Sequence, residues 1–417
     1  MIVLQAAGVL LVAAVTAGVL YLLWTLVRQR SRELDLLEQR VEGAREEVRA
    51  RHEALERERR EQDLSWSGHR KFEVARKEVA CGDEMIRSFY LVPHDKRPLP
   101  SFEPGQFLTF ELDVTKPDGT RDTVVRCYSL SDAPNPEYYR ISVKRLLAPP
   151  DEDVPPGLAS NHFHDEVEED DILDVEAPSG KFYLDRTHDR PVVLIGGGVG
   201  VTPMMSMLNH VVESGSRREV HFFHGVCNSE EQMEKDHLEQ VAREHENIEL
   251  YSCYSEPLES DGEGEDYFHE GWVTVELFKD VLPSNNYEFY VCGPPPMMKA
   301  IFSDLRDWGV PEKDIKFEAF GPASIKEDEE EHEPADVTFA RSEVTCRWED
   351  PSKSLLELAE ENGVPMDFGC RVGNCNTCLT AVKEGGVDYL RDPNETPDEG
   401  SCLTCIGVPD GDLVLDA

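Results

Sequence analysis

The cysteines near the C-terminal end have the most chemically specific spacing in this chain. Cys370, Cys375 and Cys378 form a C-x4-C-x2-C pattern, and Cys402 and Cys405 follow later. Three close cysteines and one distant cysteine are the ligand spacing of a plant-type [2Fe–2S] cluster. A zinc site usually pairs two C-x2-C units, which this segment lacks. The loop predicts a one-electron carrier, so another group must supply single electrons.

Spacing alone does not decide whether Cys402 or Cys405 is the fourth cluster ligand. From Asp336 the chain resembles the plant-type ferredoxin domain, in which the last ligand lies in a Leu-Thr-Cys tripeptide, and this resemblance favours Cys405. Asn376 stands where that family usually has glycine or serine. Because asparagine tolerates the left-handed backbone region, we expect the loop to keep its shape.

A second group of residues, in the segment before residue 188, could hold a flavin. Arg126, Tyr128 and Ser129 supply a cation for a phosphate, an aromatic wall and a small hydroxyl donor. Alternation along a strand would separate Arg126 and Tyr128 from the residue between them. Ile-Ser-Val-Lys-Arg and Gly-Leu-Ala-Ser-Asn runs add three candidates: Lys144, Gly157 and Ser160.

A glycine-rich turn after a predicted strand could hold a nucleotide. Glycines between a strand and a helix let backbone N–H groups approach a pyrophosphate at the helix N-terminus. This turn and a Cys-Gly-Pro-Pro-Pro-Met run contain the candidates Gly197, Gly198, Gly200, Thr202, Pro203, Cys292, Gly293 and Pro294. A 2′-phosphate would need a basic residue after the second strand, and none occurs between His224 and Lys235. This favours NADH over NADPH.

Together these motifs closely resemble the ferredoxin–NADP reductase superfamily, and the flavohaemoglobin reductase module in particular. The resemblance covers residues 68–417. It implies that Arg126 and Ser160 bind the diphosphate or ribityl part of FAD, and that Tyr128 and Ser129 contact its isoalloxazine ring.

The same resemblance implies roles at the nicotinamide. Cys292 would lie beside it, Glu318 would help order the hydride geometry, and Phe320 would cover the flavin. The catalytic set is therefore Ser129, Cys292 and Glu318, and the expected cofactors are FAD, NADH and a [2Fe–2S] cluster.

The N-terminal residues predict a membrane anchor. Ile2 to Val27 is almost entirely apolar and long enough to cross a bilayer. Arginines at 28, 30 and 32 follow at once, so the positive-inside rule places the head in the cytoplasm, at the inner membrane. A cleaved signal peptide would need a basic start and a shorter apolar core. We therefore expect an uncleaved single-pass helix.

We expect a multidomain α/β and all-β protein, because 417 residues exceed one core. Strands are expected at 107–112, 139–144, 192–195, 220–224 and 287–291, and helices at 203–213 and 296–308. The expected parts are a transmembrane anchor (1–27), a charged helical stalk (28–66), an antiparallel β-barrel FAD domain (67–187), a parallel α/β NAD(P) domain (188–325), an acidic linker (326–334) and a β-grasp ferredoxin domain (335–417).

The charge of the chain limits its partners. Its 84 acidic and 42 basic residues give a formal net charge of -42, which argues against nucleic acid or an anionic membrane surface as a partner. Adaptation to high salt is one explanation, and an ordinary acidic protein is the other. The stalk is either a parallel coiled-coil homodimer or a single solvated helix.

Three functions remain open on the sequence. The first is NADH oxidation with electrons passed to quinone or a membrane partner, as in the F subunit of the Na⁺-translocating NADH:quinone reductase, which this chain resembles except that its ferredoxin domain comes last. The second is the reductase component of an oxygenase, hydroxylase or desaturase. The third is a membrane-tethered redox sensor or scaffold.

Overall fold

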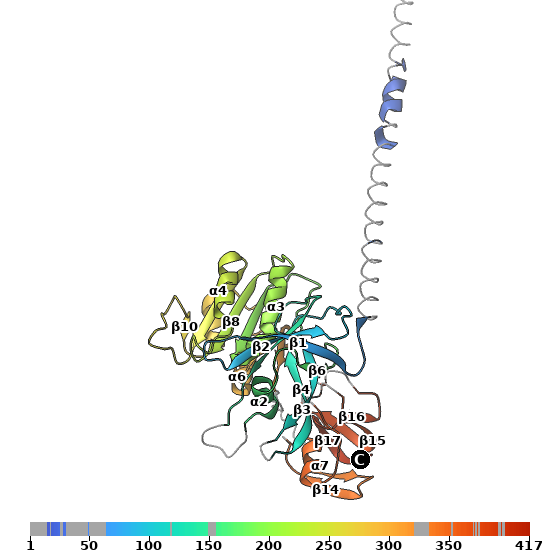
Figure 1. The fold of residues 1–417 in the computed structure, drawn as a ribbon. Coiled ribbons are helices and arrows are strands. Elements are labelled where there is room, and N and C mark those ends of the chain that lie inside the picture. Colours follow the sequence, from blue (N-terminus) through green and yellow to red (C-terminus); the bar gives the residue numbers. More distant parts are fainter. Residues whose placement is uncertain are drawn as a thin grey trace, which may run out of the picture. The chain divides into compact units, whose positions relative to one another are not determined.

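The computed structural model describes most of the chain after residue 63. The described residues are 15–16, 18–25, 28–30, 49, 64–116, 119–148, 156–320, 333–351, 353–369, 371, 373, 376–390, 393 and 397–417. The chain divides into two units, Met1–Leu64 and Ser65–Ala417. Figure 1 labels helices and strands of the second unit.

In the first unit, residues 15–16, 18–25 and 28–30 are helical. Leu20 and Leu23 are 66% and 52% exposed, and the Arg28 guanidinium lies 5.0 Å from the Trp24 ring. Among the residues for which the structure gives a position, no helix is both long and apolar enough to cross a membrane. Most of the predicted anchor and stalk lies outside the described residues, so the structure does not show the anchor.

The first sheet of the second unit has six antiparallel strands in the order β4-β3-β6-β1-β2-β5. A bridge between Leu130, just after β4, and Ile141 of β5 links the two edge strands, so the sheet curls. Apolar side chains of these strands pack into one shared core. They tend to alternate along each strand, because successive side chains of a strand face opposite sides of the sheet. The elements are β1 Arg70–Val79, β2 Ile86–Pro93, β3 Phe107–Thr115, β4 Arg121–Ser129, β5 Tyr139–Lys144, β6 Ile172–Val175 and helix α2 Leu158–Asp165.

The second sheet has six parallel strands in the order β10-β9-β8-β7-β11-β12. Apolar clusters pack on both faces, as parallel sheets need. Its strands are β7 Val192–Gly197, β8 Val220–Val226, β9 Ile248–Tyr254, β10 His269–Glu270, β11 Glu288–Cys292 and β12 Ile315–Glu318. Its helices are η1 Gly198–Gly200, α3 Val201–Glu213, α4 Lys235–Glu244, α5 Val275–Val281, α6 Pro295–Asp307 and η2 Glu312–Asp314.

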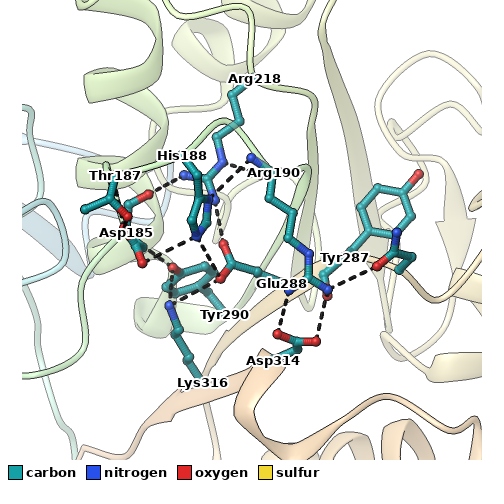
Figure 2. A network of polar contacts seen from close by, with 11 residues as sticks. Asp185, Thr187, His188, Arg190, Arg218, Tyr287, Glu288, Tyr290, Asp314 and Lys316 are labelled. Atoms are coloured by element: carbon teal, nitrogen blue, oxygen red, sulfur yellow. Dashed lines mark hydrogen bonds and ion pairs between the residues drawn. The ribbon is translucent and has the colours of Figure 1, made fainter.

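The segment between β6 and β7 connects these two sheets, and a buried ion pair holds it in place. Arg218 and Glu288 are 3% and 4% exposed, and Arg218 Nη2 donates to Glu288 Oε2 at 2.6 Å. Arg218 also donates to the carbonyls of Asp185 and Arg190, both at 2.6 Å (Figure 2). Removing one partner of such a pair leaves an uncompensated buried charge, which costs about 3–5 kcal/mol. The connection is therefore fixed at the amino ends of the parallel strands.

The third sheet contains the C-terminal strands in the order β14-β13-β17-β15-β16. β13 and β17 are parallel, and the other pairs are antiparallel. Its elements are β13 Ala335–Phe339, β14 Val344–Trp348, β15 Leu379–Tyr389, β16 Ser401–Leu403, β17 Gly407–Leu415 and helix α7 Leu355–Glu361. The predicted sequence of an antiparallel sheet, a parallel sheet and a sheet-rich C-terminal part is confirmed.

Candidate active site

Three side chains from distant parts of the chain meet where the first sheet contacts the second. Ser129 is the last residue of β4, and Cys292 and Glu318 are the last residues of β11 and β12. Cys292 and Glu318 are register partners in the parallel sheet. The Ser129 Oγ–H donates to Glu318 Oε2 at 3.3 Å. The structure thus brings together the three predicted catalytic residues.

The Cys292 side chain is a neutral wall of this site. It is fully buried, and burial, with the nearby negative charge of Glu318 as a smaller cause, raises the pKa of the Cys292 thiol well above its ordinary value. The thiolate is the nucleophilic form of cysteine. Near neutral pH Cys292 is therefore an uncharged thiol, and it contributes an apolar surface to the site.

The two glycine-containing turns pack backbone against backbone. A Cβ on Gly200 would lie 2.4 Å from the carbonyl oxygen of Cys292, and one on Gly197 would lie 2.4 Å from Met297 Sδ. A Cβ on Gly293 would lie 3.1 Å from the Gly197 backbone. Only glycine permits this approach, so the turns form a narrow cradle at the carboxyl ends of β7 and β11.

The N-terminus of α3 opens into that cradle. η1 runs directly into α3, and the Val201 N–H already donates to the Gly198 and Val199 carbonyls. No side chain caps η1 at Gly197, so the N–H groups of the glycine turn are the donors that an anion could meet. The Thr202 hydroxyl donates to the Val199 carbonyl at 3.0 Å and reinforces the turn, with Pro203 in the first turn of the helix. A pyrophosphate fits this set of donors. Pro294 caps the other turn, where α6 begins.

His224 supports the glycine turn from β8, although no motif in the sequence points to it. It is fully buried near the end of β8, and its Nε2 lies 3.3 Å from the Gly198 carbonyl oxygen. Burial lowers the pKa of His224 to about 4, so the ring is neutral and Nε2 carries the proton that the carbonyl accepts. Gly198 has a φ of +53°. His224 thus holds the turn in a left-handed conformation that glycine tolerates.

The predicted flavin residues lie along β4, β5 and α2. Gly157 is the N-cap of α2, and a Cβ there would lie 2.6 Å from Ser160 Oγ. The Lys144 Nζ lies 3.4 Å from Glu231 Oε2. Arg126 Nη1 donates to its neighbour's carbonyl at 2.8 Å, and within the described residues its guanidinium forms no ion pair. A guanidinium, a tight glycine and a short helix N-terminus fit a diphosphate.

The Tyr128 ring packs against two phenylalanines of the first sheet's core. Its centroid lies 5.0 Å from that of Phe163 and 5.8 Å from that of Phe110. Burial raises the pKa of the Tyr128 phenol, which therefore stays neutral. Phe320 is 43% exposed at the end of the described second-sheet segment. An exposed aromatic ring two residues after Glu318 fits a group that covers a planar ligand.

Two of the predicted cluster ligands lie together. Cys378 and Cys405 are buried in one small apolar cluster, and the Thr404 hydroxyl donates to the Cys378 carbonyl at 3.1 Å. Cys402 packs instead into the main core of the third sheet. Cys370 and Cys375 lie outside the described residues. The arrangement favours Cys405 over Cys402 as a ligand.

The backbone around these cysteines turns sharply. Arg371, Gly373 and Asn376 have φ values of 58°, 76° and 56°. A Cβ on Gly373 would lie 2.4 Å from Ile406 Cδ1. Asn376 takes the left-handed conformation that its residue type tolerates. Such turns let a loop fold closely over a cluster.

Comparison with known proteins identifies the parts of the chain. Family models for an oxidoreductase FAD-binding domain, an oxidoreductase NAD-binding domain and a 2Fe-2S iron-sulfur cluster binding domain match residues 71–183, 194–302 and 337–410. The flavohaem-like FAD/NAD-binding domain of nitric oxide dioxygenase from Vibrio cholerae is 30% identical with a TM-score of 0.53, over 61% of this chain and 100% of that one. The chain belongs to the ferredoxin–NADP reductase superfamily. This member carries its [2Fe–2S] domain after the nucleotide domain.

Other similar proteins match this chain over part of their length. The flavohemoprotein of Bacillus thuringiensis subsp. konkukian is 45% identical over 259 residues, which are 62% of each chain. An intact type IV self-sufficient cytochrome P450 monooxygenase is 22% identical with a TM-score of 0.56, over 84% of this chain and 41% of that one, and shares the fold. The three matching models confirm FAD, NAD and a [2Fe–2S] cluster as the cofactors.

Proposed function

We propose that this protein is a membrane-anchored electron transferase that oxidises NADH and delivers electrons to quinone or a membrane redox partner. The observation that carries the proposal is the contact between Ser129 and Glu318, because it joins the end of a flavin-domain strand to the nicotinamide side of the nucleotide domain. When bound, FAD accepts a hydride and releases electrons singly, which a [2Fe–2S] cluster requires.

The protein's own residues bind and orient the nucleotide. The glycine cradle and the turn that leads into α3 would hold the pyrophosphate, and the buried Cys292 would keep water from the nicotinamide side of the site. The Glu318 carboxylate holds the Ser129 hydroxyl proton in a fixed direction. Fixed groups of this kind act without reorganising at the moment of reaction.

The N-terminal unit supports a membrane anchor with the head in the cytoplasm. The described large apolar side chains from Val15 to Trp24 are each at least half exposed, so nothing described in that unit covers them. Arginines follow directly at 28 and 30. A lipid environment would bury this surface, and the stalk after it would hold the head away from the membrane, as a single helix or a homodimer.

The position of the [2Fe–2S] domain favours a second acceptor, the terminal component of an oxygenase, hydroxylase or desaturase. In the superfamily some reductases of that kind also place this domain last, whereas the resembling quinone reductase subunit places it first. A redox sensor is the third possibility, and it would turn over little NADH with any one-electron acceptor.

Anaerobic titration of the purified full chain with NADH tests the electron-transfer proposal. Both the flavin and the [2Fe–2S] absorption should bleach. The Cys378→Ser variant should still show flavin bleaching by NADH but should not reduce cytochrome c. Intact absorption in the presence of NADH would overturn the proposal.

Membrane extraction tests the anchor. The full chain should stay with membranes in alkaline carbonate, and an L20R/L23R double variant should be released. The L20A/L23A variant is the matched control and should stay bound. Release of the unaltered chain by carbonate would overturn the anchor. Ubiquinone reduction by membrane-inserted protein then separates the quinone acceptor from an oxygenase component.

A further inference from the structure

A buried hydrogen-bond chain crosses from the flavin domain to the nucleotide domain away from the cofactor residues. Asp132, just after β4, accepts from Asn209 Nδ2 of α3 at 2.7 Å through its carboxylate. Its backbone carbonyl accepts from the Ser206 hydroxyl of the same helix, also at 2.7 Å. His237 of α4 extends the chain, because its Nε2 lies 2.8 Å from Asn209 Oδ1. Ser206 and Asn209 are 0% and 6% exposed.

A second contact between the two domains lies beside the first. Arg140 of β5 is 5% exposed, and its Nη1 donates to Glu234 Oε1 at 3.0 Å. Its Nε lies 3.6 Å from Asp132 Oδ2, so one guanidinium joins a carboxylate of each domain. Glu234 has a left-handed φ of 50°, and its N–H donates to the Ala80 carbonyl at 2.8 Å. Backbone strain at a residue that is not glycine persists only where the surroundings hold it.

Both ends of this network reach the candidate active site through rigid elements. Asp132 follows Ser129 by three positions, and the two residues are joined by the buried Leu130 and Ser131. Asn209 lies on α3, whose N-terminus forms the pyrophosphate cradle. A helix transmits a displacement along its axis, so any shift at Asn209 moves the cradle relative to Ser129.

We propose that Asp132 and Asn209 are positioning residues that set the separation between the flavin side and the nicotinamide side of the site. The inference rests on the proposed function. Neither residue touches the cradle, and their effect passes through α3 and the segment from Ser129. A misplacement of about 1 Å can slow such a reaction roughly a hundredfold.

The ion-pair cluster of Figure 2 is not expected to set the separation between the two sides of the candidate site. It lies at the amino ends of β7, β11 and β12, whereas the candidate site lies at their carboxyl ends. Arg218 and Glu288 hold the covalent connection between the domains. The connection limits rotation between the domains, and the Asp132–Asn209 contact joins the segment after β4 to α3.

The test introduces a second carboxylate into the contact in one variant and relieves the repulsion in a double variant. The Asn209→Asp variant sets two carboxylates against each other across the domains, while His237 can still donate to the new side chain. The D132N/N209D double variant restores a hydrogen bond with donor and acceptor exchanged. The Asn285→Asp variant is the matched control, because Asn285 Nδ2 donates to the Trp308 carbonyl at 2.8 Å within the nucleotide domain.

Three readouts separate positioning from folding. Stopped-flow mixing gives the rate of flavin bleaching at saturating NADH, calorimetry gives the Kd of ADP-ribose, and the long-wavelength flavin–nicotinamide charge-transfer absorption reports ring stacking. For N209D we expect the rate to fall by about tenfold or more, the charge-transfer absorption to weaken, and the ADP-ribose affinity and flavin content to stay unchanged. The double variant should recover to within about threefold of wild type.

Each other outcome overturns the inference. A wild-type rate and absorption in N209D would show that the contact does not position the site. A loss in N209D that the double variant does not restore, or an equal loss in the Asn285→Asp control, would show a general structural effect. Failure of NADH to bleach the unaltered protein would refute the proposed function itself, which is a distinct result.

Discussion

Ser129 and Glu318 are 189 residues apart in the chain, and the Ser129 Oγ–H donates to Glu318 Oε2 at 3.3 Å. Glu318 reaches this place because β12 pairs with β11 in a register that sets it beside Cys292. Ser129 reaches it because β4 ends at the same edge of the second sheet. A contact between two domains therefore depends on two strand ends, which is a rigid way to hold a hydroxyl and a carboxylate together.

The Glu318→Gln variant should slow flavin bleaching by NADH. A hydrogen bond to a charged group contributes about 1.5–3 kcal/mol, which corresponds to roughly a 10- to 150-fold lower rate. The KM for NADH should change little, because Glu318 lies outside the pyrophosphate cradle. Stopped-flow absorbance measures the rate. The Glu312→Gln variant, which alters a glutamate that pairs with Arg306 in the same domain, should react like wild type, and an equal loss there would contradict the role of Glu318.

The Gly200→Ala variant should weaken nucleotide binding. The added Cβ would lie 2.4 Å from the Cys292 carbonyl oxygen, so the two turns of the cradle must separate. Overpacking of this kind costs about 1–3 kcal/mol, and we expect the Kd of ADP-ribose to rise by roughly 5- to 150-fold. Calorimetry measures this Kd.

The control for that variant lies at the other end of α3. Gly215 has a φ of +67°, and a Cβ added there would meet no heavy atom within 4 Å beyond its chain neighbours. The Gly215→Ala variant should lower the thermal midpoint through backbone strain and leave the ADP-ribose Kd unchanged. Equal weakening by both variants would mean that helix stability, and not the cradle, controls binding.

The sequence predicts the parts of this site that carry motifs. Ser129, Cys292 and Glu318 each stand in a recognisable run, and the glycines at 197, 198 and 200 follow a buried apolar strand. Short motifs fix local backbone conformation, so their residues can be named before the fold is known. The curled antiparallel sheet and the parallel sheet follow from their apolar periodicity for the same reason.

The contacts between domains could not be predicted in this way. Asp132, Asn209 and Glu234 are ordinary polar residues in a turn, a helix and a helix cap, and nothing in their spacing shows that they meet. His224 looks like any histidine in an apolar strand, and only the pairing of β7 with β8 places it beside Gly198. Long-range polar contacts depend on tertiary placement, which local patterns do not contain.

Two cysteine variants should identify the fourth cluster ligand. Cys405→Ser should abolish the [2Fe–2S] absorption, because Cys405 lies with Cys378 in one buried cluster. Cys402→Val should keep the cluster, because Cys402 packs into the main core and valine has a similar volume. Iron content and electron paramagnetic resonance of the dithionite-reduced protein measure cluster occupancy. Loss of the cluster in Cys402→Val alone would reverse the assignment.

The free energy of unfolding should fall at alkaline pH. Ionisation of the Cys253 thiol in the unfolded chain should cause part of this loss. Burial raises the pKa of this thiol from 9.0 to about 12. Below pH 9 the thiol is neutral in both states. Between pH 9 and 12 only the unfolded chain releases the proton, so unfolding is favoured as pH rises, by about 1.4 kcal/mol at pH 10.

Comparison with a Cys253→Val variant isolates this contribution. The free energy of unfolding in urea should fall from pH 8 to pH 10 by about 1.4 kcal/mol more in the wild type than in the variant. Other alkaline titrations are common to both proteins and cancel in the difference. Equal losses in the two proteins would show that Cys253 does not stay protonated in the folded state.

The excess of acidic residues should make stability depend on salt. With 84 acidic and 42 basic residues, most long-range charge interactions in the folded chain are repulsive. The Debye length falls from about 10 Å at 0.1 M to about 3 Å at 1 M salt, so added KCl should weaken this repulsion. The exposed ion pairs weaken as well, but each contributes only about 0–1 kcal/mol. The thermal midpoint should therefore rise between low and molar KCl.

A variant with less charge provides the control for that salt effect. Glu246, Glu259 and Glu265 are exposed in the nucleotide domain, and changing all three to glutamine removes negative charge without disturbing the core. Its thermal midpoint should be higher than that of the wild type at low salt, and the two values should converge in molar KCl, because screening removes the repulsion that the glutamines relieve. Scanning calorimetry measures both curves. A wild-type midpoint independent of KCl would show that the acidic surface carries no stability penalty, and would leave solubility as the consequence of the charge.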